Sequence, residues 1–162
     1  MNKKFYKYEL SLKLSRYLLF RYTTSLIFFI SLYWLAGAFL NNRNVTIAIP
    51  FTICILMLIV NIKTYSVIKN KNNKNNLKLI ITLLRITIII MILAILIASF
   101  DMKLILPYLS SYKFSFGLLI SLILLLVISY KNIINISLNK DRAYGRYKKS
   151  MDNLVNERIK YV

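Results

Sequence analysis

The chain alternates between long apolar runs and short polar segments. Four runs, at residues 22–40, 45–62, 79–100 and 114–130, carry at most one charged residue each. A helix needs about 20 apolar residues to cross the hydrocarbon core of a bilayer. Each run is close to that length, so the pattern predicts four transmembrane helices and an all-α integral membrane protein.

The basic residues are distributed unevenly between the polar segments. The chain has 23 Lys and Arg against 5 Asp and Glu, and 20 of the basic residues lie in residues 1–21, in the region from 63 to 85, or after residue 130. Basic segments beside membrane spans are retained in the cytoplasm. The charge therefore predicts that both termini are cytoplasmic, and the short connectors predict an antiparallel four-helix bundle.

The two ends of the chain outside the membrane domain, 22–130, are basic and partly apolar. Residues 1–21 and 131–162 both show apolar side chains at helical spacing among positive ones. We expect an amphipathic basic helix at each end. In the C-terminal helix, attachment to anionic lipid and docking onto a cytoplasmic partner both remain open. The candidate contact residues there are Arg142, Arg146, Lys148 and Lys149.

Two arginines lie at or within the predicted spans. Arg21 and Arg85 both fall near the cytoplasmic boundary, with Arg85 the deeper of the two. An arginine at this depth extends its guanidinium to the lipid phosphates while its aliphatic stem stays in the apolar layer. For Arg85, a specific contact with a lipid headgroup or another anionic ligand is the alternative. We expect anionic lipid to be a partner and expect no nucleic acid, because topology accounts for the charge.

Aromatic side chains gather near the predicted outer boundary. Tyr33 and Trp34 lie toward the end of the first span, and Tyr108, Tyr112 and Lys113 lie in or beside the last connector. Tyr and Trp favour the headgroup level of a bilayer, and they often dominate recognition surfaces. We therefore expect these five residues to form an outer recognition surface.

Contacts between the helices should depend on small and polar residues. In lipid the hydrophobic effect does not hold one helix against another, so close approach and hydrogen bonds matter more. Ala94 with Ala98, and Gly117 with Ser121, have the spacing of small residues on one helical face. The hydroxyls of the spans are expected to bond their own backbone one turn earlier.

Groups suited to catalysis are scarce. The chain has no histidine and one cysteine, Cys54, which lies in the second apolar run. It has five carboxylates, and none of these carboxylates lies inside an apolar run. Catalysis needs convergent acid, base or nucleophilic groups, and ion-coupled transport normally uses a carboxylate within a span. We therefore expect a protein that is not an enzyme and that uses no metal or cofactor.

A protein that works by contact is the remaining class. In size, basic charge and number of spans, the chain resembles the immunity proteins that bacteria encode beside antimicrobial peptides. The resemblance implies self-protection against a membrane-active peptide. An accessory subunit of a membrane complex such as an ABC exporter is equally open, and a small oligomeric transporter or channel is the alternative. The abundance of Lys, Asn and Ile indicates an AT-rich genome and a bacterial cytoplasmic membrane; self-association is left open.

Overall fold

The computed structural model describes residues 3–40, 44–69, 74–101, 105–106, 112–140, 145 and 149. Four α-helices account for most of these residues. They are α1 (Lys3–Leu40), α2 (Asn44–Lys69), α3 (Lys74–Phe100) and α4 (Tyr112–Ser137). All four are long and apolar enough to cross a membrane. This confirms the prediction of an all-helical, multi-pass membrane protein.

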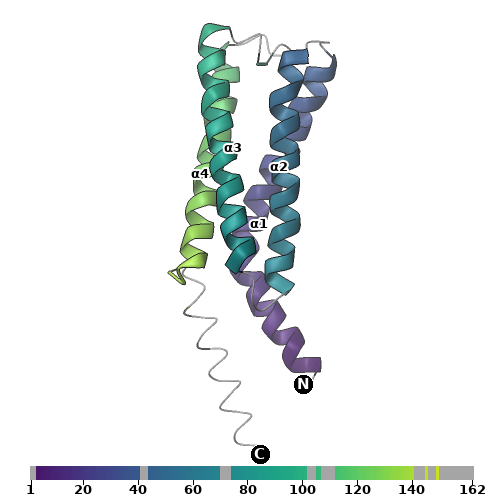
Figure 1. Ribbon diagram of the computed structural model, residues 1–162, viewed down its shortest axis with the longest axis vertical. Coiled ribbons are helices and arrows are strands. Elements are labelled where there is room, and N and C mark those ends of the chain that lie inside the picture. Colours follow the sequence, from purple (N-terminus) through teal and green to yellow (C-terminus); the bar gives the residue numbers. More distant parts are fainter. Residues whose placement is uncertain are drawn as a thin grey trace, which may run out of the picture.

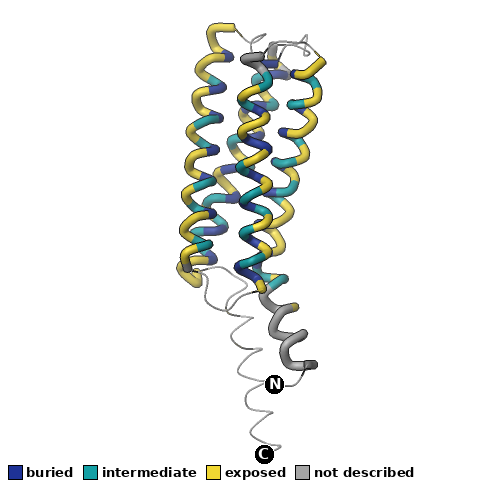
Figure 2. The backbone as a smooth tube through the Cα atoms, turned by 45° about the vertical axis from the view of Figure 1, so that its right-hand side comes forward, coloured by how far each residue is buried: buried dark blue, intermediate teal, exposed yellow. Residues whose placement is uncertain are grey.

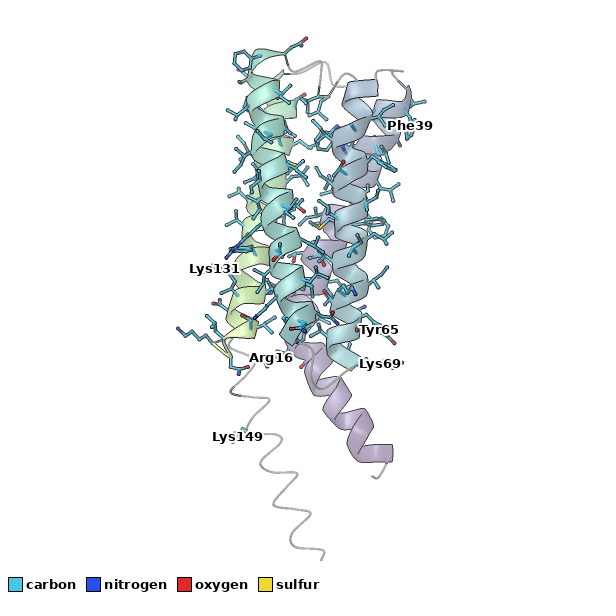
Figure 3. The ribbon with its side chains drawn as sticks, viewed as in Figure 1. Arg16, Phe39, Tyr65, Lys69, Lys131 and Lys149 are labelled. Carbon is cyan, nitrogen blue, oxygen red and sulfur yellow. The ribbon has the colours of Figure 1, made fainter. Side chains whose placement is uncertain are left out.

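The helices form a ring in which each one packs against two others. Helix α1 contacts α2 and α4, and α3 contacts the same two helices from the other side. Figure 3 places Arg16, Tyr65 and Lys69 at one end of the bundle, here called the near end, and Phe39 at the other, the far end. Helix α1 is the longest, with 38 residues, and its first turns project beyond the near end (Figure 1). The N-terminal segment is thus helical and continuous with the first span.

A seam of buried residues with a seven-residue period runs along every helix. Figure 2 shows it as regularly spaced buried positions on each tube, separated by exposed ones. In α1 the seam alternates steps of three and four residues, through Tyr17, Phe20, Thr24, Ile27, Ser31, Trp34 and Ala38; in α4 it runs through Ser115, Leu119, Leu122, Leu126, Ser129, Ile133 and Ile136. Alternating steps of three and four are the packing pattern of left-handed helical bundles. The seam therefore determines which face of each helix points inward.

The seam holds many of the small and hydroxylated residues, while large apolar residues cover the outside. Ala94 and Ala98 of α3 are both fully buried, so this pair of small residues serves contact between helices within the chain. Large exposed residues such as Phe29, Leu93 and Leu124 surround the bundle. This distribution suits a bundle in lipid, where close packing rather than removal from water drives helix association.

The hydroxyls bond as the sequence predicts, and a few also cross between helices. Thr87 donates to the carbonyl of Leu83 at 2.9 Å, and Thr23, Thr24, Ser31, Thr52 and Thr82 make similar bonds to carbonyls three or four residues earlier. Thr24 also donates to Asn61 Oδ1 on α2 at 2.9 Å. Ser129 of α4 donates to Thr23 Oγ1 at 2.8 Å. These bonds link α1 to both of its neighbours.

Arg16 joins α1 to the end of α4. Its guanidinium donates to the carbonyl of Ile136 at 2.8 Å and to Asn139 Oδ1 at 2.7 Å. Asn139 has a positive φ of 56°, the left-handed conformation that often follows the last turn of a helix. A cation at the carbonyl end of a helix is favoured by the helix dipole. Arg16 therefore stabilises this junction in addition to contributing to the basic charge of the N-terminal segment.

The far end of the bundle is closed by two residues of the last connector. Ile105 and Leu106 are fully buried, although they lie between α3 and α4 in the sequence. The indole nitrogen of Trp34 donates to the carbonyl of Ile105 at 3.0 Å. Trp34 is 1% exposed, so it lies in the core and holds the connector in place. Its position differs from the expected one on the outer surface, because its indole fits the buried seam.

Candidate functional site

A groove lies between α1 and α4 on the described part of the chain. It has a volume of about 760 Å³ and opens to the side of the bundle, near the far end. Its lining residues are Phe29, Ile30 and Tyr33 from α1, with Lys113, Gly117, Leu118 and Ser121 from α4. Ligand sites are typically concave, mostly apolar, and furnished with few polar groups. This groove fits that description.

Helical spacing explains why these residues share the groove. Lys113, Gly117 and Ser121 are four residues apart, so they lie on one face of α4. A methyl group added at Gly117 would meet no atom within 4 Å, so the floor of the groove is open there. The Ser121 hydroxyl donates to the carbonyl of Leu118 at 2.7 Å and is satisfied by its own helix. The α4 side therefore offers a shallow surface on which a second helix could approach closely.

The α1 side of the groove is aromatic. Tyr33 is 76% exposed and Phe29 is 66% exposed. Phe29 packs edge-on against Phe28, with ring centroids 5.5 Å apart. Phe29 also lines a second, smaller groove of about 260 Å³ on the α2 side of α1, where Phe28 joins it. The aromatic residues of α1 are thus exposed toward α4 and toward α2, and a molecule bound in either groove would contact an aromatic ring.

Among the described residues that line the larger groove, Lys113 is the one that carries a charge. It is the second residue of α4 and is exposed. The start of a helix carries a partial positive charge, so the dipole of α4 does not stabilise the lysine and adds to its field. This end of the groove is therefore suited to a negative group, such as a carboxylate or a phosphate.

The structure brings together only part of the predicted outer surface. Tyr33 and Lys113 both line the groove, whereas Trp34 is buried beside them in the seam. Tyr108 and the side chain of Tyr112 lie outside the described residues. The sequence indicates Gly117 and Ser121 only as a candidate pair for helix packing; their exposure in the groove adds them to the site.

Only some of the predicted lipid-contact residues lie in the described part of the chain. Arg21 is exposed on α1, and Arg85 is exposed on α3 with a hydrogen bond to α4. Lys149 is exposed, while Arg142, Arg146 and Lys148 lie outside the described residues, as does most of the predicted C-terminal helix.

No protein-family model matches the chain, and comparisons with curated proteins and with solved structures find no match either.

Proposed function

We propose that this chain is a non-catalytic bacterial membrane protein that protects its producer by binding the membrane-inserted helix of a toxic peptide. The observation that carries the proposal is the open groove between α1 and α4. A helix in lipid gains most from close backbone approach, which a surface made by Gly117 and Ser121 permits. The aromatic rings of Phe29 and Tyr33 would supply contact area on the other wall.

The orientation of the bundle is part of the same proposal. We take the helices as antiparallel, with both termini in the cytoplasm, because 20 of the 23 basic residues then lie inside. The groove then opens in the outer half of the membrane, where a peptide arriving from outside inserts. Reporter fusions after Asn76 and at the C-terminus should report cytoplasm, and a fusion after Pro107 should report the exterior. An exterior C-terminus would contradict this orientation.

The groove can be filled without disturbing the bundle. Ser121→Leu and Gly117→Leu place bulky side chains where the structure is open, so we expect membrane expression to be unchanged. Protection should fall at least tenfold, measured as the peptide concentration that stops growth of a sensitive bacterium producing each variant. Where a neighbouring gene encodes a short peptide, that peptide is the challenge.

Ser99→Leu is the matched control for Ser121→Leu. Both serines are exposed, and each donates to the carbonyl three residues earlier, Ser99 at 2.6 Å. Ser99 lies on α3, away from the groove. Equal loss of protection in the two variants would show that added bulk, rather than occupation of the groove, causes the defect.

The charge of the partner can be tested at Lys113. Lys113→Glu should weaken binding of a partner that places a carboxylate at this level, and Lys113→Gln should have a smaller effect. If positive side chains of a cationic peptide meet the lysine instead, Lys113→Glu should strengthen binding and Lys113→Gln should strengthen it less. The two outcomes distinguish a negative group from a positive one at the outer end of the groove.

A subunit of an exporter would use the same groove for a transmembrane helix of its partner. If the neighbouring gene encodes an ATPase, export replaces survival as the assay, with the same variants.

An ion-coupled carrier differs from both, because it needs a titrating carboxylate. Asp101→Asn and Glu9→Gln should therefore leave contact activity intact, whereas replacing Tyr108 and Tyr112 together by Ala should weaken it. The opposite pattern would reject contact in favour of a transporter.

A further inference from the structure

Arg85 and Tyr130 form a polar pair on the membrane-facing side of the bundle. The Nε atom of Arg85, on α3, donates to the Tyr130 hydroxyl, on α4, at 2.7 Å. The guanidinium carbon lies 5.7 Å from the centroid of the same ring. Arg85 is exposed and Tyr130 is partly buried. The pair therefore joins two neighbouring helices at a surface that faces lipid.

Most of the hydrogen-bonding capacity of this pair is unused. A guanidinium has five N–H donors, and only the one on Nε has an acceptor among the described residues. The Tyr130 oxygen accepts that bond, so its own proton is directed elsewhere. The four terminal N–H donors of Arg85, on its two NH2 groups, and the hydroxyl proton of Tyr130 are thus held close together without an acceptor in the described part of the chain.

From the end of the apolar run in α4, we place the pair near the level where a bilayer changes from acyl chains to headgroups. Tyr130 is the last residue of an apolar run, and the next residue is the exposed Lys131. Side chains of a helix tilt toward its start, so Arg85 leans from α3 toward the near end and meets Tyr130 there. Figure 3 shows Lys131 on the side of the bundle formed by α3 and α4. Two positive charges therefore lie near this boundary.

The neighbouring surface is suited to an acyl chain. One turn farther from the near end, Ile89 on α3 is 56% exposed and Val127 on α4 is 45% exposed. A molecule with a phosphate at Arg85 and a hydrocarbon chain directed toward the bilayer centre would contact both. Free phosphate would use the donors but not this apolar surface.

We infer that Arg85, Tyr130 and Lys131 form a binding site for the phosphate of an anionic phospholipid in the cytoplasmic leaflet. The planar guanidinium contacts two phosphate oxygens, and the Tyr130 hydroxyl donates to a third. The bond from Nε to Tyr130 holds the guanidinium in one orientation, which separates this site from an arginine that samples many headgroup positions. Two cations favour a lipid with net negative charge over a zwitterionic lipid.

The site can be tested by binding of phosphatidylglycerol to the purified full chain in detergent. Native mass spectrometry should show that the wild-type chain retains phosphatidylglycerol about tenfold more strongly than phosphatidylcholine. Arg85→Gln should remove about tenfold or more of that affinity, and Tyr130→Phe about threefold. Circular dichroism without lipid should show that both variants keep the wild-type helix content.

Arg21→Gln is the matched control, because Arg21 is also exposed and expected at the lipid phosphates, but its side chain has no hydrogen bond to a described residue that would hold it in one orientation. It should change lipid retention less than twofold. Equal losses at Arg21 and Arg85 would overturn the inference, since any surface arginine would then suffice. Displacement of the lipid by equimolar inorganic phosphate would also overturn it in favour of a free-anion site. The binding test does not depend on protection or export, so its failure is distinguishable from failure of the proposed function.

Discussion

Removing the Trp34 hydrogen bond should open the far end of the bundle. The indole N–H is the donor to the buried carbonyl of Ile105, at 3.0 Å, and both residues are almost fully enclosed. Trp34→Phe keeps an aromatic ring in the seam but leaves that carbonyl without its partner. An unsatisfied buried acceptor costs about 1–3 kcal/mol, which corresponds to an opening equilibrium raised about 5- to 150-fold.

Limited proteolysis can measure that opening. Trypsin cleaves after lysine, and Lys103 lies two residues before Ile105 in the connector. When opening and closing are fast compared with cleavage, the cleavage rate follows the population of the open form. We therefore expect cleavage after Lys103 in the detergent-solubilised chain to be about 5- to 150-fold faster in Trp34→Phe than in wild type, with the site mapped by mass spectrometry.

Tyr33→Phe supplies the control for this measurement. Tyr33 is adjacent in sequence but 76% exposed, and its hydroxyl has no hydrogen bond to a described residue. A surface change of this kind usually alters stability by less than about 0.5 kcal/mol, so the cleavage rate should stay within about twofold. If Trp34→Phe is cleaved no faster than Tyr33→Phe, the indole bond does not hold the connector and the reasoning is wrong.

Three further predictions test the packing and the tail. Ser31 Oγ lies 3.2 Å from Cys54 Sγ, so Ser31→Cys should form a disulfide between α1 and α2 on mild oxidation, whereas Leu32→Cys, which faces lipid, should not. Ala94→Leu should destabilise the bundle by about 1–3 kcal/mol in a denaturant titration, because it overfills a fully buried position. A peptide of residues 139–162 should bind anionic vesicles and lose binding in salt; equal binding to neutral vesicles at high salt would indicate apolar insertion or a specific partner.

The apolar runs predict the far ends of the helices better than the near ends. The first run ends at Leu40 and the third at Phe100, where α1 and α3 also end. At the near end, α2 continues seven residues beyond its run, to Lys69, and α4 continues to Ser137. Helices can extend into polar residues outside the membrane because water accepts those side chains. Hydropathy detects the membrane-buried part of a helix, so it misses such extensions.

The sequence predicts the inward face of each helix less well than its ends. In a soluble protein an apolar stripe marks the buried side, but here the lipid-facing side is equally apolar. The informative signal is instead a seven-residue spacing of small and hydroxylated residues, as in Thr24, Ser31 and Ala38 of α1. Tyr33 and Trp34 illustrate the difficulty: both suit a membrane boundary by composition, and only the helical register places Trp34 on the seam and Tyr33 outside.

The groove follows from the same seam. Gly117 and Ser121 lie outside the buried positions of α4, where the other helices carry large residues such as Leu93 or Phe29. Small residues at these positions leave the side of α4 open next to α1. In a bilayer an acyl chain can fill such a gap, so removal from water does not favour a peptide over lipid. A bound helix must therefore gain its affinity from close packing on the glycine, ring contacts with α1, and a charge matched to Lys113.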